Sequence, residues 1–120
     1  GVQTCALPIW GEERPQAPAF TGQMLVLDQP RRTLRERIDR RVEEMFAAGL
    51  IEETRAAAAK PGGIGPTARQ AAGYAEALDV LAGRLTMAEA IRLTQQRTRQ
   101  LAKRQITWLR SFKSAIWLGC

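Results

Sequence analysis

The segment from Met87 to Phe112 has the residue spacing of one long amphipathic helix. Thr86 and Glu89 occupy the two ends of a Thr-x-x-Glu capping box, which marks the start of a helix. Residues at helical intervals then form one stripe: Met87, Ile91, Thr94, Thr98, Leu101, Ala102, Gln105, Leu109 and Phe112. We therefore predict a helix that packs along this stripe and carries charge on its other faces.

The excess positive charge of the chain lies in this same segment. The sequence has 18 basic and 12 acidic residues, a net charge of +6 and no histidine. No acidic residue follows Glu89, whereas the first 89 residues carry 11 basic and 12 acidic side chains. Four cations, Arg92, Arg99, Lys103 and Arg110, line up along about 27 Å of the helix. Such a row favours an RNA or DNA partner, the alternative being a solvated helix face.

Several classes of function are excluded by composition. Without histidine, zinc sites that use imidazole and the Ser-His-Asp and Cys-His nucleophile systems cannot form. Cys5 and Cys120 lie near opposite ends without Cys-x-x-Cys spacing, and we expect free thiols in preference to a disulfide. No apolar run approaches the roughly 20 residues of a membrane span. We expect no membrane association and a cytoplasmic location.

The chain before the helices divides into short parts. Residues 1–9 resemble a foreign, adapter-derived peptide, with a disordered N-terminus as the alternative. Residues 10–23 carry two prolines and suit an extended connector. Residues 24–28 have the length and apolarity of a strand, which needs a sheet partner from elsewhere. The helical portion is expected over residues 24–120.

Three helices are predicted before the long one. Thr33 and Thr67 each stand three residues before Glu36 or Gln70, as N-caps do. The first helix is expected to end at Gly49 in a left-handed conformation. The second covers Ile51 to Ala59, and the third runs from about Ala68 to Leu81.

Glycines mark the connections in this region. The linker Pro61-Gly-Gly-Ile-Gly-Pro66 is not a phosphate-binding loop, because no Gly-Lys-Ser/Thr follows it. Gly73, inside the predicted third helix, indicates a close approach of backbone segments, and Gly83 lies near the end of that helix. The fold class expected is mainly α with one or two short strands.

Side chains suited to RNA contact occur at several positions. Trp108 and Tyr74 could stack on unpaired bases, the alternative for Trp108 being a ring packed in the core. Arg37 and Arg41 project from one side of the first helix. They are expected either to form local ion pairs with Asp39 and Glu43 or to clamp a phosphate.

Four ordered blocks give the chain a family resemblance. They are Arg37-Ile-Asp-Arg-Arg-Val-Glu-Glu-Met45, Gly49-Leu-Ile-Glu-Glu53, Thr67-Ala-Arg-Gln-Ala-Ala-Gly-Tyr-Ala-Glu76 and Thr98-Arg-Gln-Leu-Ala-Lys-Arg-Gln-Ile-Thr-Trp-Leu-Arg110. The sequence thereby resembles the tRNA dimethylallyltransferases, or isopentenyl-diphosphate:tRNA transferases. The resemblance runs from about Trp10 to Leu118, includes a short strand at residues 116–118, and covers the C-terminal third of a family member.

The resemblance implies a P-loop NTPase-like α/β enzyme with an inserted helical domain. Members transfer a dimethylallyl group from its diphosphate to N6 of the adenosine 3′ of the anticodon, with Mg²⁺. The family's phosphate-binding loop, general base and diphosphate-contacting Thr belong to its N-terminal part. We therefore expect no catalytic residue and no metal ligand among these 120 residues, and no transferase activity from them alone.

The resemblance also implies binding residues. Arg41 is the candidate contact for the diphosphate, with Arg37 second. The tRNA-binding candidates are Gln70, Gly73, Tyr74, Arg99, Lys103, Arg104, Gln105, Thr107, Trp108 and Arg110. Ala75 replaces the usual basic residue and Ala72 a larger aliphatic one, which puts one phosphate contact in doubt.

The partners expected are the anticodon stem-loop of tRNA and, in the intact enzyme, dimethylallyl diphosphate, with the protein a monomer. Two other functions fit the residues. One is a non-enzymatic helical module that binds RNA or DNA, and the other is an amphipathic helix that lies on a membrane surface.

Overall fold

The computed structural model describes residues 22–119 of the chain. Its elements are β1 (Leu25–Asp28), α2 (Arg31–Ala47), α3 (Leu50–Ala58), α4 (Pro66–Arg69), α5 (Tyr74–Leu81), α6 (Met87–Arg110) and β2 (Ile116–Gly119). The mainly α fold class is confirmed. Residues 1–9, most of the predicted connector and both cysteines lie outside the described residues, as does any disulfide between them.

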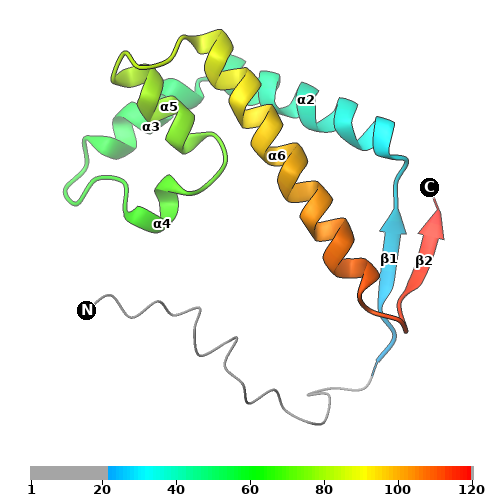
Figure 1. Cartoon of the computed structure of the whole chain (residues 1–120). Coiled ribbons are helices and arrows are strands. Elements are labelled where there is room, and N and C mark those ends of the chain that lie inside the picture. Colours follow the sequence, from blue (N-terminus) through cyan, green and yellow to red (C-terminus); the bar gives the residue numbers. More distant parts are fainter. Residues whose placement is uncertain (1–21, 120) are drawn as a thin grey trace.

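The two strands pair with each other in parallel, as drawn in Figure 1. Leu25 is opposite Ile116 and Asp28 is opposite Gly119, so the whole helical region is the crossover between them. Both strands predicted from the sequence are present within one residue of the expected bounds. Val26 is buried, whereas the neighbouring Leu27 is 69% exposed, because alternate residues of a strand point to opposite faces.

The start of α6 is confirmed in detail. The Glu89 backbone N–H donates to Thr86 Oγ1 at 3.2 Å, and the Thr86 N–H donates to Glu89 Oε2 at 2.8 Å. These reciprocal bonds satisfy two backbone donors that a helix start would otherwise leave unpaired. They also hold the pKa of the Glu89 carboxyl below its ordinary value, because hydrogen bonds from Thr86 favour the charged form.

The N-caps predicted at Thr33 and Thr67 are wrong. Helix α2 begins directly after Pro30, whose carbonyl already accepts the Leu34 N–H at 3.0 Å, so Thr33 lies within the first turn. Helix α4 has Gly65 as its N-cap and Pro66 as its first residue, which leaves Thr67 inside the helix. In both cases the fixed φ of proline starts the helix earlier than the hydroxyl would.

The continuous helix predicted from Ala68 to Leu81 is also wrong. The chain forms the one-turn α4, leaves the helical conformation, and begins α5 after Gly73. Gly73 has φ +101°, a value that L side chains rarely adopt, and this breaks the helix. A close contact does exist at Gly73, but with a side chain and not with another backbone segment, because a Cβ there would lie 3.0 Å from Leu50 Cδ2.

The joint between α2 and α3 agrees with the prediction. Gly49 has φ +104° and separates the two helices, and α3 ends one residue before the expected Ala59. One cluster of buried apolar residues comes from four helices: Val42 and Phe46 of α2, Leu50 and Ile51 of α3, Ala77 of α5 and Ala90 of α6.

The packing stripe predicted for α6 is correct only in part. Thr94 is buried and Ile91 and Thr98 are half-buried, whereas Met87 is 45% exposed, Leu101 is 44% exposed and Gln105 is exposed. The reason is the crossing of α2 and α6, which Figure 1 shows near the start of α6. Beyond it the two helices diverge, and the second half of α6 extends toward the strands without a covering helix.

Candidate functional site

The second half of α6 carries the largest group of sequence-predicted site residues. Lys103, Arg104, Gln105, Thr107 and Trp108 are all exposed. An open groove of about 590 Å³ is lined by Lys103, Arg104, Thr107 and Trp108, together with Gln100. Gln105 does not line this groove. The structure thus brings cations, a hydroxyl and an indole together on one helix surface.

The aromatic side chain of this group is accessible. Trp108 is 54% exposed and its ring meets that of Phe112 edge to face, with centroids 4.8 Å apart. Phe112 therefore supports the indole from one side and leaves the rest of it open. The sequence left open whether this ring would be core, and within the described residues it is at the surface.

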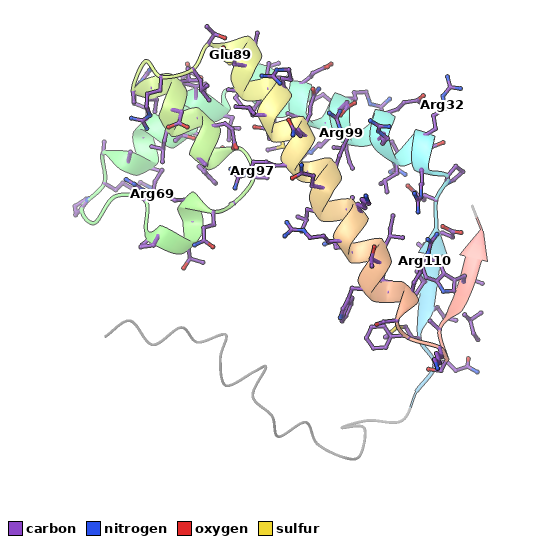
Figure 2. The ribbon with its side chains drawn as sticks, viewed as in Figure 1. Arg32, Arg69, Glu89, Arg97, Arg99 and Arg110 are labelled. Carbon is purple, nitrogen blue, oxygen red and sulfur yellow. The ribbon has the colours of Figure 1, made fainter. Side chains whose placement is uncertain are left out.

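The cations on α6 divide into two classes. Within residues 22–119, Lys103 and Arg104 form no ion pair with an acidic side chain. Arg99, in contrast, donates to Asp39 Oδ1 of α2 at 2.5 Å, and Arg97 donates to Glu76 Oε1 of α5 at 2.5 Å. Figure 2 shows Arg97 and Arg99 near the middle of the helix.

Although no acidic residue follows Glu89 in the sequence, Arg97 and Arg99 of α6 therefore both have acidic partners. They come from helices 60 and 21 residues earlier in the chain. Arg110, at the end of α6 that lies beside the strands in Figure 2, has its guanidinium carbon 6.0 Å from the Trp117 ring centroid. Lys103 and Arg104, in contrast to Arg97 and Arg99, thus keep a charge that no described carboxylate neutralises.

The predicted tRNA-contacting stretch before α6 is structured by internal hydrogen bonds. The Gly73 N–H donates to Glu76 Oε2 at 3.0 Å, and the Tyr74 O–H donates to Glu53 Oε1 at 2.5 Å. The bond to the Glu53 carboxylate, and its charge, raise the pKa of Tyr74 above its ordinary value. Neither Gln70 nor Tyr74 lines the groove beside Trp108, so the structure places the two predicted blocks at separate surfaces.

Arg37 and Arg41 line a different groove, of about 610 Å³, which also includes Ala72 and Thr94. From the sequence, one of two expectations was that Arg37 and Arg41 would form ion pairs with Asp39 and Glu43. Among the described residues these pairs are not formed. Asp39 pairs instead with Arg99, and Glu43 accepts from Gln95 Nε2 at 3.2 Å. Thr94 is 1% exposed, and its Oγ1 has no hydrogen-bond partner within residues 22–119.

Sequence reasoning missed two arginines near the start of α2. Arg31 and Arg35 line a third groove, between α2 and α6, together with Arg99 and Lys103. Their four-residue spacing on one helix was a usable signal. Their position opposite the α6 cations became visible only in the folded chain.

Two further structural findings concern metals and membranes. Residues 22–119 contain no group of three or more His, Cys, Asp or Glu side chains that could hold a metal ion. In the same part of the chain, no helix has the length and apolarity needed to cross a bilayer.

The family model and the relatives that match this chain all describe the same kind of transferase. Residues 6–112 match the family model of the IPP transferases. The chain is 48% identical to the tRNA dimethylallyltransferase of Anaeromyxobacter dehalogenans (strain 2CP-C), over 83% of this chain and 33% of the relative. It is 43% identical to the enzyme of that name from Corynebacterium jeikeium, over 98% of this chain and 38% of the relative.

Two solved structures of tRNA isopentenylpyrophosphate transferases have a fold similar to that of this chain. The full-length tRNA isopentenylpyrophosphate transferase of Bacillus halodurans superposes with a TM-score of 0.74 at 37% identity, over 81% of this chain and 32% of that one. The corresponding transferase of Staphylococcus epidermidis gives 0.73 at 33% identity, over 80% and 31%. The chain thus spans about a third of the length of the relatives it matches. Because the family model covers residues 6–112 of 120, this chain belongs to the IPP transferase family.

Proposed function

We propose that the chain is the C-terminal part of a tRNA dimethylallyltransferase and that the second half of α6 binds the anticodon stem-loop. The partners that follow are tRNA and, for the intact enzyme, dimethylallyl diphosphate. The proposal includes a monomer, a cytoplasmic location and a Mg²⁺-dependent reaction whose metal ligands lie outside residues 22–119.

The observation that carries the RNA-binding role is the exposed group Lys103, Arg104, Thr107 and Trp108 around one groove. Phosphates are bound by cations that have no competing carboxylate, and unpaired bases stack on accessible aromatic rings. Lys103 and Arg104 meet the first condition among the described residues, and Trp108 meets the second. A solvated helix face would not need an exposed indole beside two unpaired cations.

The other predicted contacts are part of the same proposal. Arg41, with Arg37 second, would bind the diphosphate, since both line an open groove and neither is neutralised by a described carboxylate. Gln70, Gly73 and Tyr74 would meet the RNA on a second surface. The chemistry of transfer is assigned to the N-terminal part of the enzyme.

The test is binding of a 120-residue chain to an anticodon stem-loop oligonucleotide, measured by fluorescence anisotropy across a salt series. Lys103→Ala with Arg104→Ala should weaken binding about tenfold at low salt and reduce the magnitude of the salt slope by about 1.5, because two phosphate contacts are lost. Trp108→Ala should weaken binding with little change in that slope.

The matched control is Arg55→Ala with Lys60→Ala, which removes the same charge from exposed positions at the end of α3. Its affinity should stay close to that of the unmodified chain. Absence of binding at low salt, or equal binding by the two double variants, would contradict the proposal.

A further inference from the structure

The groove between α2 and α6 includes two cations of α2, Arg31 and Arg35, that the function proposed above does not use. Its polar wall carries four cations: Arg31 and Arg35 from α2, and Arg99 and Lys103 from α6. Its floor is apolar, and Leu34, Ile38 and Ile106 contribute to it. The volume is about 440 Å³. We call it the α2–α6 groove.

Most of the charge around this groove is uncompensated. On α2, Arg32 pairs with Glu36 and Arg40 pairs with Glu44, and neither arginine lines the groove. Within residues 22–119, Arg31 and Arg35 form no ion pair, and Lys103 forms none either. Arg99 alone is partly neutralised, by Asp39. Three positive charges without a described carboxylate partner therefore line one groove.

Such an arrangement is unfavourable until an anion enters it. Like charges four residues apart on a helix repel, and here one such pair on α2 faces another on α6. Bound phosphates would remove this repulsion and release the counterions that the groove otherwise holds. The amide side chains of Gln96 and Gln100 add neutral hydrogen-bond donors to the same walls.

The groove is continuous with the proposed RNA-binding surface. Gln100 and Lys103 line both the α2–α6 groove and the groove beside Trp108. Along α6, the step from Lys103 to Trp108 is about 7.5 Å, and the step from Lys103 back to Arg99 is about 6 Å. Cations thus run from the exposed indole, over Lys103, into the space between the two helices.

We infer that the α2–α6 groove binds the phosphodiester backbone of the stem of the same RNA, with Arg31 and Arg35 contacting phosphates beyond those held by Lys103 and Arg104. The inference rests on the proposed function. A continuous track of cations suits a polyanionic chain, whereas a single small anion would use only one part of it. Arg31 and Arg35 thereby widen the binding surface from one helix to two.

The experiment compares two double variants of α2 in the 120-residue chain. Arg31→Ala with Arg35→Ala removes two cations that line the groove, and Arg32→Ala with Arg40→Ala removes two from the same helix that do not. The probes are an anticodon stem-loop and an unpaired heptanucleotide with the loop sequence. All four positions are exposed and alanine favours helix, so circular dichroism should report unchanged helicity.

The groove variant should bind the stem-loop about tenfold more weakly at low salt, with the salt slope reduced in magnitude by about 1.5. Its affinity for the heptanucleotide should change less than twofold, and the Arg32/Arg40 variant should resemble the unmodified chain with both probes. Arg31→Lys with Arg35→Lys should restore the salt slope, because lysine still neutralises a phosphate. In the unmodified chain, phosphate-ethylation interference should mark stem positions that the groove variant no longer marks.

The inference is overturned if the two α2 variants bind alike while Lys103→Ala with Arg104→Ala still loses affinity. That result would leave the proposed function in place. If the Lys103/Arg104 variant also binds as the unmodified chain does, the proposed function fails, and this inference fails with it. Equal loss of heptanucleotide and stem-loop affinity in the groove variant would also refute a stem-backbone contact.

Discussion

The guanidinium of Arg97 donates a hydrogen bond to the carboxylate of Glu76, a residue that is only 4% exposed. The other carboxylate oxygen of Glu76 accepts the Gly73 N–H at the start of α5. One buried side chain thus connects the break before α5 to the middle of α6. A buried carboxylate is stable in this position only because both of its oxygens have donors.

Loss of the Glu76 carboxylate is expected to destabilise the chain. Glu76→Ala leaves the Gly73 N–H without its acceptor and Arg97 without its partner, which should lower the free energy of unfolding by about 2 kcal/mol. Glu76→Gln keeps a carbonyl oxygen as acceptor and should cost less. Urea unfolding followed by circular dichroism measures both.

The control for Glu76 is Glu44→Ala, which removes a carboxylate paired with Arg40 on the exposed side of α2. Exposed ion pairs contribute little, so its effect should stay within about 0.5 kcal/mol. Equal losses for Glu76→Ala and Glu44→Ala would show that the buried contacts have no special weight.

Gly73→Ala is expected to destabilise more than the same change at Gly62. Both glycines have positive φ, +101° and +84°, so both substitutions strain the backbone by about 1–2 kcal/mol. At Gly73 the new Cβ would also lie 3.0 Å from Leu50 Cδ2, whereas at Gly62 nothing lies within 4 Å. Gly73 also has ψ −40°, outside the left-handed helical region, so the larger loss expected there combines backbone strain with the close approach, and a difference near zero would argue against both.

Local signals predicted the parts of this fold that depend on neighbouring residues. The Thr86 box identified the start of α6, and Gly49 identified the end of α2, because each acts within one helical turn. Thr33 and Thr67 carried the same signal and failed, since a proline one to three residues earlier had already set the helical conformation. Capping boxes therefore predict less when a proline precedes them.

Features that depend on tertiary contacts were not predictable. Leu50 of α3 packs closely against the break at Gly73, and the ion pair of Arg99 requires Asp39 from 60 residues earlier. The α2–α6 groove likewise depends on which faces of two distant helices meet. That Lys103, Arg104, Thr107 and Trp108 lie near one another was predictable because they share one helix, whereas the exposure of Gln105 and Trp108 was not.

Tyr74 provides the last prediction, which concerns pH. Its O–H donates to the Glu53 carboxylate, so removing the proton would place two negative charges in contact, and the pKa of Tyr74 is raised above its ordinary value near 10. The chain has one tyrosine, so the ultraviolet absorbance of tyrosinate reports this group alone. In the folded chain the titration midpoint should lie above 10, and Glu53→Gln should lower it, because the amide carries no charge.

The same shift makes stability depend on pH in a defined window. The unfolded chain loses the tyrosine proton near pH 10, while the folded chain still holds it. The contribution of Tyr74 to stability is therefore fully present below pH 10 and is lost as the pH rises toward the folded pKa. The unfolding temperatures of the unmodified chain and of Tyr74→Phe should thus converge above pH 10. Lysines titrate in the same pH range in both proteins, so their effect cancels in this comparison. Parallel curves through that window, or a tyrosine midpoint unchanged by Glu53→Gln, would show that the hydrogen bond to Glu53 does not control this titration.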